Sequence, residues 1–473
     1  MSNQVPTARP VIAFVGGGAS ATVTAIALLR ATAWLRLRYR IVVIDEHGRH
    51  GRGTAYATAD PRHLLNSPAK SMSALPDRPG HLVEWAAKSG VPCGPDTFLP
   101  RSCYGDYLDA SLATAAAGAA PHAEVVFRRD RVVAAHADAD RVVLELPGGA
   151  RMEAAAAVFA TGGTPASLPT VLGGTFDAAR TGGAPVVADP WHPVSGFASL
   201  RGCGAALAVG TGLTMVDTAL SMCAADPDTV VHAVSRRGLV PRRHRLPLVA
   251  PPGLVDLRST DGAPLPLRTL LRRLRAAIDA YPGDWRHVVD SVRPHTADLW
   301  QGLTPAEQEV FLARLARHWE SARHRMAPEV ADRFDHLRAS GRVRLHTGRV
   351  TALEDDGRRS SARLSDGTVI DVDAVVNCTG GVPARSPLIR RLISDGTARP
   401  DHLGLGLATC PRGALVTPSG LVSRRLFALG PVRRGQLYET TAIPEIRAQA
   451  EPLAERIADT VLRNRRVAPA TIP

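Results

Sequence analysis

The chain has 473 residues, of which 45% are hydrophobic and 21% are charged, a composition typical of a globular protein with two or three domains. Its formal net charge of +13 comes from arginine, since Lys70 and Lys88 are the only lysines. The arginines are scattered and not interleaved with aromatic residues, so we expect no nucleic-acid partner. No apolar run reaches about 18 residues, so we expect no membrane span and a cytoplasmic location.

The six cysteines and the histidines predict no metal site. No two cysteines are three positions apart, which excludes a CxxC redox centre or zinc ribbon. His47 and His50 form an H-x-x-H pair, but no third ligand accompanies them. No Ser-His-Asp arrangement stands out either, so hydrolytic and metal-dependent mechanisms are not expected.

The first chemical signal is a glycine loop between a predicted strand at residues 11–15 and a predicted helix reaching about residue 30. The loop and first helical turn contribute Gly16, Gly18, Ala19 and Ser20 to a G-x-G-x-x-A pattern. Such glycines let the backbone approach a pyrophosphate, and the helix N-terminus supplies unpaired amides. The next strand ends at Asp45, whose carboxylate is suited to a ribose diol. The pattern predicts FAD; the alternatives are a structural glycine turn and a solvated strand-end acid.

A second glycine loop follows a predicted strand at residues 204–209. It lacks the third glycine of the pattern, and its candidate NADPH contacts are Gly210, Thr211, Gly212, Leu213 and Thr214. The strand after it ends at Ser235, Arg236 and Arg237 rather than at an acid. Guanidinium groups pair with phosphate, whereas a carboxylate would repel it, so this unit is predicted to prefer NADPH over NADH. The alternative is an incidental arginine pair.

An internal repeat suggests how the two units are joined. Residues 124–163 and 342–381 both consist of short strand-like pieces that end in an apolar run followed by Thr-Gly-Gly. We therefore predict a discontinuous FAD domain at 1–185 and 382–473 and an NADPH domain at 186–264 and 338–381. Residues 265–337 have helical periodicity, and we predict a helical insertion that packs on the NADPH domain and is a candidate lid. Its tryptophans, at 285, 300 and 319, are expected in the core.

Four longer motifs carry a family resemblance: HLLNSPAKSMSALPDRPG at 63–80, ADPWHP at 188–193, VSRRG at 234–238 and YETTAIPEIRAQA at 438–450. With them the chain resembles a bacterial FAD/NAD(P)-binding oxidoreductase family, related to NADPH-dependent single-component flavoprotein monooxygenases of the N-hydroxylating type. The resemblance implies an α/β fold with two Rossmann-like, glutathione-reductase-like dinucleotide-binding domains and a helical insertion. The full Baeyer–Villiger fingerprint is absent, so ketone oxygenation is not expected.

The resemblance also implies site residues. Further FAD contacts would be Asn66, Arg101, Val132, Thr161, Gly162, Gly430 and Thr441. Glu439, Thr440 and Thr441 would lie near the isoalloxazine, at the start of a last helix that contains Pro444; an N-cap role is the alternative for either threonine.

No catalytic residue is assigned, and two candidates remain. Asn66 would contact the flavin ring or a nicotinamide, or else be an ordinary turn residue. His192 would position the nicotinamide or cap a turn. Arg242, Arg243 and His244 would bind a substrate carboxylate or form the edge of the NADPH site.

The leading hypothesis is an FAD-containing, NADPH-dependent monooxygenase. NADPH would reduce FAD, dioxygen would add to give a C4a-(hydro)peroxyflavin, and one oxygen atom would pass to an amine or amino-acid nitrogen. The partners would be dioxygen and a small-molecule substrate, whose identity stays open, as does the oligomeric state. The alternatives are an NADPH-dependent flavin oxidoreductase without oxygen insertion and a non-catalytic, redox-sensing nucleotide-binding protein.

Overall fold

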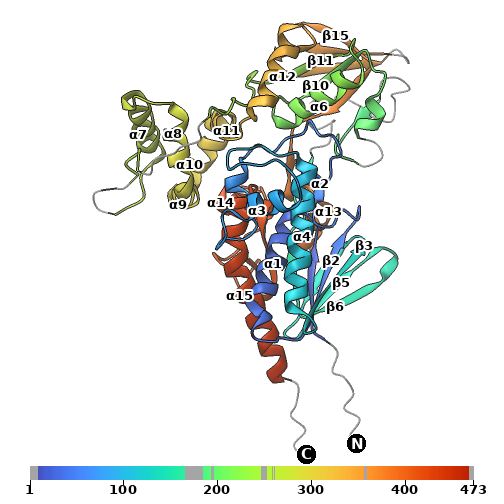
Figure 1. Cartoon of the computed structure of the whole chain (residues 1–473), viewed down its shortest axis with the longest axis vertical. Helices are drawn as coiled ribbons and strands as arrows, with labels where there is room; N and C mark the ends of the chain where they lie inside the picture. Colours follow the sequence, from blue (N-terminus) through green and yellow to red (C-terminus); the bar gives the residue numbers. More distant parts are fainter. Residues whose placement is uncertain are drawn as a thin grey trace, which may run out of the picture.

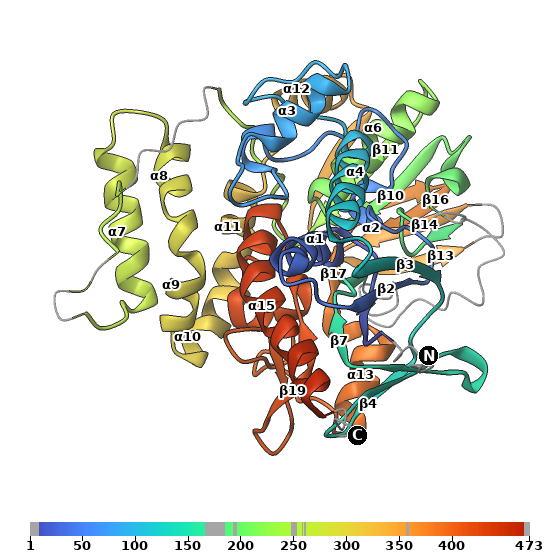
Figure 2. The same ribbon diagram turned by 60° about the horizontal axis from the view of Figure 1, so that its bottom comes forward.

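The computed structural model describes residues 9–165, 185–192, 196–246, 253–257, 259, 262–355 and 359–467. Figure 1 shows three parts: an α/β unit made of the two ends of the chain, a second α/β unit above it, and a group of helices to one side. The same three parts are distinguishable when the molecule is turned (Figure 2). This arrangement confirms the predicted α/β fold with two units and a helical insertion.

The first unit is built on a six-stranded sheet with the order β18-β19-β7-β1-β2-β3. All neighbouring strands are parallel except β18 and β19. The strands are β1 (Val11–Val15), β2 (Tyr39–Asp45), β3 (Ala123–Arg129), β7 (Ala156–Phe159), β18 (Ala414–Val416) and β19 (Val422–Ala428). β1 and β7 read as nearly continuous apolar runs because both faces of the sheet are covered.

Helices cover one face of this sheet and a small antiparallel sheet covers the other. The helices are α1 (Ala19–Ala33), α4 (Arg101–Ala119) and α15 (Ile443–Val467), whose apolar side chains share one core with the sheet. The small sheet contains β4 (Ala134–Ala137), β5 (Val142–Glu145) and β6 (Arg151–Ala154), and α13 (Pro387–Ser394) packs beside it. The shorter helices of this unit are α2 (Gly53–Tyr56), α3 (His81–Lys88) and α14 (Arg434–Leu437).

The second unit repeats this plan on a five-stranded parallel sheet with the order β12-β11-β10-β16-β9. The strands are β9 (Val186–Val187), β10 (Ala205–Val209), β11 (Val230–Ser235), β12 (Val343–Thr347) and β16 (Ala374–Asn377). α6 (Leu213–Ala225) and α12 (Pro328–Ala339) pack on one face. The antiparallel strands β13 (Val350–Asp355), β14 (Ser360–Leu364) and β15 (Val369–Val372) cover the other.

The predicted internal repeat is present in the structure. β3 to β7 and β12 to β16 have the same layout: a parallel strand, three antiparallel strands and a return to the parallel sheet. The chain segments at the ends of the two Thr-Gly-Gly motifs then lie side by side, as β8 (Thr164–Pro165) pairs antiparallel with β17 (Gly381–Val382). The two chain crossings between the units are therefore adjacent.

The helical insertion contains α7 (Leu267–Ala280), α8 (Trp285–Ser291), α9 (Thr296–Gly302), α10 (Pro305–Val310), a π-helical turn at Phe311–Leu315 and α11 (Ala316–Arg323). Two expectations need correction here. α12, which the predicted limits assign to the insertion, packs Val330 and Phe334 into the core of the second unit, because it is the helix that precedes β12. The insertion also packs on more than the NADPH unit, since Trp300 is buried against Tyr438 of the first unit.

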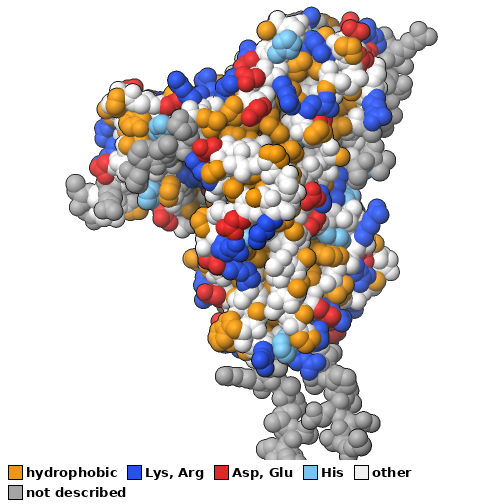
Figure 3. Space-filling view, viewed as in Figure 1, with side chains coloured by type: hydrophobic (Ala, Val, Ile, Leu, Met, Phe, Trp, Pro, Cys, Tyr) orange, Lys and Arg blue, Asp and Glu red, His pale blue; other side chains and the backbone are white. Residues whose placement is uncertain are grey.

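The surface has no basic stripe on the face shown in Figure 3, where arginine and acidic side chains are interspersed. Many of the arginines form ion pairs, including those of Arg52 with Asp106 and Asp109. No helix among the described residues is long and apolar enough to cross a membrane.

Candidate nucleotide and substrate sites

The two glycine loops have nearly the same backbone conformation. Gly16 and Gly210 have φ angles of 103° and 111°, in the left-handed region that favours glycine. A Cβ atom on Gly16 would lie 2.5 Å from the carbonyl oxygen of Ala160, and one on Gly210 would lie 2.5 Å from that of Cys378. Each loop therefore packs closely against the end of the strand that leads into its own Thr-Gly-Gly motif.

The helices after the loops also begin alike. Gly18 precedes α1 with φ −80° and ψ −174°, and Gly212 precedes α6 with φ −83° and ψ −170°. In both, the amides of the first helical turn point out of the helix, as a pyrophosphate site requires. The second loop keeps this geometry although Met215 stands where the third glycine of the pattern would be.

Asp45 lies at the end of β2, next to the first loop. Its Oδ2 accepts a hydrogen bond of 3.0 Å from the Gly17 amide, and its Oδ1 accepts from the amides of His47 and Arg49. The carboxylate therefore orients the loop through these backbone hydrogen bonds. His50 packs behind Gly17, and its buried Nδ1 has no partner among the described residues.

Four other predicted FAD contacts, Thr161, Gly162, Gly430 and Val132, lie on the side of the first loop. Gly162 follows Thr161, whose buried Oγ1 has no hydrogen-bond partner among the described residues. Gly430 lies so close to the first turn of α1 that a Cβ atom on it would be 2.5 Å from Ser20 Oγ. Val132 is buried in the core that also contains Val15. An unsatisfied hydroxyl beside a glycine cradle fits a phosphate- or ribose-bearing ligand.

Thr440 connects this loop to the last helix. Its Oγ1 donates to the Gly430 carbonyl at 2.8 Å and accepts from Gln449 Nε2 at 2.8 Å. The Gln449 carboxamide oxygen in turn accepts from the Gly430 amide. The hydroxyl of Thr440 is therefore engaged in hydrogen bonds that stabilise the position of Gly430, whereas the neighbouring Thr441 is exposed.

The candidate 2′-phosphate contacts of the second unit differ in their surroundings. Ser235 Oγ lies 2.8 Å from Thr211 Oγ1, so the strand end is hydrogen-bonded to the glycine loop. Arg236 is exposed and makes no hydrogen bond or ion pair within the described chain. Arg237 instead donates to the carbonyl oxygens of Ala313 and Arg314, at 2.9 and 2.7 Å, and so binds the helical insertion. The two arginines therefore differ in their availability to a ligand.

A cavity of about 220 Å³ lies where the first unit, the second unit and the insertion meet. Its walls come from the loop at residues 66–71, from His244 of the second unit, from four residues of the insertion and from residues 439–445. The insertion contributes Asp290, Arg293, Arg323 and His324. Predicted residues Asn66 and Thr441 both line this cavity.

The carboxylates in the cavity wall are paired with arginines. Arg293 makes a two-pronged contact with Glu445, at 2.7 and 2.9 Å. Arg323 lies 3.1 Å from Glu439 and 3.0 Å from Asp290. The wall is thus rich in charge but electrically balanced, and the pairs with Glu445 and Glu439 attach the insertion to the first unit.

Asn66 and His244 connect the two units at the cavity. His244 Nε2 donates to the backbone oxygen of Asn66 at 3.0 Å, which leaves Nδ1 unprotonated, buried and without a partner among the described residues. Burial lowers the pKa of His244 to about 4, so the ring is neutral at physiological pH. Arg243 pairs with Asp332 instead of facing the cavity.

Two predicted residues lie away from the cavity. Arg101 forms an ion pair with Asp217 of α6, 2.7 Å away, and donates to the Leu64 carbonyl. His192 lies in a turn, where its amide donates to the Asp189 carbonyl, and its ring packs against His47 at a centroid distance of 5.4 Å. His192 is thus brought to the β2 end of the first unit and not to the wall shared by Asn66 and Thr441.

Sequence reasoning missed the residues that join the units. His63, Asp217 and the ion-paired residues of the insertion gave no recognisable spacing, because their partners are distant in the chain. The sequence motifs at 63–80 and 188–193 could have indicated these contacts, since residues of both motifs contribute to them.

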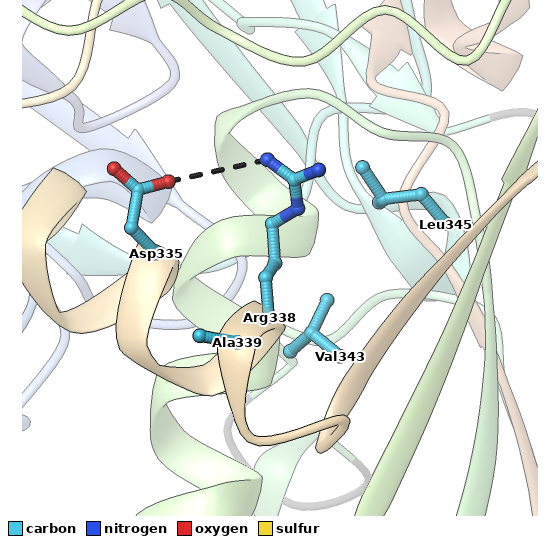
Figure 4. Close-up of a pocket in the computed structure, with 5 residues that line it drawn as sticks. All are labelled: Asp335, Arg338, Ala339, Val343 and Leu345. Atoms are coloured by element: carbon cyan, nitrogen blue, oxygen red, sulfur yellow. Dashed lines mark ion pairs between the residues drawn. The ribbon is translucent and has the colours of Figure 1, made fainter.

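A larger open depression of about 430 Å³ lies on α12 and β12, lined by Asp335, Arg338, Ala339, Val343 and Leu345 (Figure 4). Its strand residues belong to the first half of β12, whereas the glycine loops follow the carboxyl ends of their strands. Ligands of open parallel sheets bind at the carboxyl ends, so this depression is not the candidate site. Among the described residues, no group of His, Cys, Asp and Glu is arranged to hold a metal ion.

A comparison with known protein families finds a sequence match within the first unit. A sequence model of FAD-NAD(P)-binding proteins matches residues 13–164, which contain the first glycine loop, Asp45 and Thr161. Residues 13–164 of the first unit are therefore similar to FAD-NAD(P)-binding proteins. No curated protein sequence matches the chain.

Several solved structures share the whole fold. The reduced form of ornithine hydroxylase from Pseudomonas aeruginosa has a TM-score of 0.63 at 16% identity, covering 96% of this chain and 100% of the other. L-lysine 6-monooxygenase from Pseudomonas syringae has a TM-score of 0.63 at 16% identity, with coverages of 97% and 100%. Ornithine N-hydroxylase from Kutzneria sp. 744, with reduced FAD, NADP⁺ and L-ornithine, has a TM-score of 0.60 at 15% identity, with coverages of 97% and 100%. These likenesses confirm the resemblance at the level of the fold.

Proposed function

We propose that this chain is an FAD-containing, NADPH-dependent monooxygenase that hydroxylates the nitrogen of a small-molecule amine or amino acid. The observation that carries the proposal is the position of the cavity. Thr440 in its wall holds Gly430 against α1 of the first nucleotide unit, and His244 brings the second unit to the same wall. A substrate in this cavity would be next to both nucleotide sites. The structural neighbours that act on ornithine or lysine support the choice of an amine nitrogen.

The first unit would hold FAD. The amides at the start of α1 and the backbone of Gly16 and Gly18 would bind the pyrophosphate. Asp45 would accept hydrogen bonds from the ribose, and the unsatisfied Thr161 hydroxyl would meet the cofactor near Gly162. Bound FAD would accept a hydride from NADPH and activate dioxygen for oxygen transfer.

The second unit would hold NADPH. The start of α6 and the loop from Gly210 to Thr214 would bind its pyrophosphate in the geometry of the first loop. Ser235 and the exposed Arg236 would bind the 2′-phosphate. Arg237 would act indirectly, because its hydrogen bonds to Ala313 and Arg314 hold the insertion against this strand end.

The residues of the cavity would orient the substrate and limit the access of water. The ion pairs of Arg293 with Glu445 and Arg323 with Glu439 keep the insertion closed over this wall. Excluding water from this wall would limit side reactions that release hydrogen peroxide instead of transferring oxygen to the substrate. Asn66 and Thr441, which line the cavity, would contact the substrate or the flavin ring.

The test is a product assay on the purified holoenzyme with NADPH, oxygen and separate amines, beginning with L-ornithine and L-lysine. A hydroxylated amine formed in proportion to NADPH consumed supports the proposal. Release of all the oxygen as hydrogen peroxide with every amine would instead indicate an oxidoreductase without oxygen insertion. A protein that takes up no FAD would contradict the proposal altogether.

A further inference from the structure

A buried polar connection joins the two nucleotide units on the side of α6. It involves Asp60, His63 and Arg101 of the first unit and Asp217 and Ser221 of α6. The side chain of His63 is completely buried, and that of Asp217 is 4% exposed. Buried polar groups are retained in a fold only when they are paired, and these are paired across the boundary between the units.

The hydrogen bonds around His63 have a consistent direction. His63 Nε2 faces the carbonyl oxygen of Asp217, which can only accept, so the proton is on Nε2 and Thr58 Oγ1 donates to Nδ1 at 2.7 Å. Nε2 donates to Ser221 Oγ at 2.8 Å and to the Asp217 carbonyl at 3.2 Å. Ser221 Oγ then donates to Asp60 Oδ2 at 2.6 Å. Every donor in this chain of contacts has an acceptor, and its middle members come from different units.

The ion pair of Arg101 and Asp217 lies beside these contacts. Arg101 Nη2 is 2.7 Å from Asp217 Oδ2, and its Nε donates to the Leu64 carbonyl at 3.1 Å. Trp191 covers both groups, with Arg101 Cζ at 5.5 Å from its ring centroid and the His63 ring at 5.4 Å. Trp191 of the ADPWHP motif thus packs against both parts of this connection.

The connection is attached to α6, the helix that begins at the second glycine loop. Asp217 and Ser221 are four residues apart, so they lie on one face of the helix, within three turns of Gly212. The first backbone amides of the same helix directly follow the second glycine loop. Fixing Asp217 and Ser221 to the first unit therefore fixes the second loop relative to the first.

We propose that Asp217 and Ser221, held by Arg101, His63 and Asp60, are positioning residues that set the orientation of the NADPH unit for hydride transfer. This inference rests on the proposed function. The hydride carries two electrons and one proton from NADPH to FAD and leaves NADP⁺, and its rate depends steeply on the distance and angle between the two rings. The connection holds that geometry without contacting either nucleotide.

The test uses the full-length holoenzyme with Asp217→Asn and Ser221→Ala as separate variants. Arg342→Met is the matched control, because Arg342 also holds α6, through the carbonyls of Cys223 and Asp226, but from within the second unit. Anaerobic stopped-flow reduction by NADPH separates the limiting rate from the dissociation constant. We expect Asp217→Asn and Ser221→Ala each to lower the limiting rate by about tenfold and to change the NADPH dissociation constant by less than about threefold. Reduction by dithionite should be unchanged in all proteins.

Hydrogen exchange measured by mass spectrometry supplies a readout that does not depend on activity. Asp217→Asn and Ser221→Ala should speed exchange at residues 57–66 and 213–221, and Arg342→Met should do so only near residues 222–226. A wild-type protein that binds FAD and is reduced by NADPH, with variants reduced at the wild-type rate, would overturn the positioning role. Unchanged exchange in both segments would overturn it as well. Failure of the wild type itself to be reduced would instead contradict the proposed function.

Discussion

Gly16 and Gly210 occupy equivalent places in the two units, with φ angles of 103° and 111°, and each lies against the strand end that precedes a Thr-Gly-Gly motif. The likeness extends to Gly18 and Gly212, which begin α1 and α6 with almost the same angles. The same strand–loop–helix geometry therefore occurs in both units.

Substitution of Gly16 should abolish flavin binding. In Gly16→Ala, the new Cβ would lie 2.5 Å from the Ala160 carbonyl oxygen, and the residue would keep a φ angle that alanine rarely adopts. The loop must shift away from the pyrophosphate position, so we expect a loss of FAD affinity of about 100-fold or more, equivalent to about 3 kcal/mol. Absorbance of the purified protein near the flavin bands measures the FAD content.

Gly90→Ala is the control for that substitution. Gly90 also has a positive φ angle, 71°, but a Cβ atom on it would meet no atom within 4 Å. The variant should lose about 1 kcal/mol of stability from backbone strain alone and keep its flavin. Equal loss of FAD in both variants would contradict a specific role for Gly16.

The discrimination between NADPH and NADH should depend on Arg236 more than on Arg237. Arg236 is free to pair with a 2′-phosphate, whereas Arg237 is engaged by the Ala313 and Arg314 carbonyls. Loss of one charge-assisted contact costs about 1.5–3 kcal/mol, so Arg236→Met should raise the NADPH dissociation constant by about 10- to 100-fold and leave that of NADH nearly unchanged. Titrations with both nucleotides measure this. A larger change in discrimination in Arg237→Met would show that the insertion moves away when NADPH binds.

Stability should fall in mild acid partly because of His244. Its pKa is about 4 in the folded protein, owing first to burial, against a reference value of 6.5 in the unfolded chain. The unfolded state therefore binds a proton that the folded state does not between these values. The stabilisation is complete above about pH 6.5 and declines as the pH falls towards 4, with about 2 kcal/mol lost by pH 5.

Urea unfolding at pH 7.5 and 5.0 measures this loss for wild type and His244→Gln. The glutamine can still donate to the Asn66 carbonyl but does not titrate, so the variant should lose less stability between the two pH values. Contributions of the other histidines cancel in the comparison. An equal loss in both proteins would show that His244 is accessible to protons in the folded state.

Trp300 should be a main attachment point of the insertion. It is 3% exposed, its Nε1 donates to the Gly435 carbonyl at 2.9 Å, and its ring lies 4.9 Å from that of Tyr438. Trp300→Ala should cost about 3–5 kcal/mol through the cavity and the lost hydrogen bond, whereas Trp34→Ala, at a site that is 77% exposed, should cost less than about 0.5 kcal/mol. Thermal unfolding of the two variants gives the comparison.

Much of the fold could be predicted from sequence because its signals are local. The runs at Val11–Val15 and Ala205–Val209, the glycine loops after them and the strand-end residues Asp45 and Ser235 each lie within a short stretch of chain. The repeat of five strands could be recognised because both copies end in the same Thr-Gly-Gly motif.

The attachment of the insertion and the contacts between the units could not be predicted in the same way. Trp300 packs on Tyr438, and Arg101 pairs with Asp217, although each pair is far apart in sequence. An arginine-rich chain gives no local sign of which guanidinium meets which acid. Arg101 was therefore predicted as a flavin contact and Arg237 as a phosphate contact, whereas the structure shows their donors engaged by protein groups.

The most direct test of two nucleotide sites with different preferences is a spectrum of the purified protein, followed by anaerobic addition of NADPH and, separately, of NADH. We expect a yellow protein whose flavin bands bleach rapidly with NADPH and slowly with NADH. A colourless protein that takes up no added FAD, or a flavin that both nucleotides reduce equally well, would contradict the assignment of FAD and NADPH to the two units.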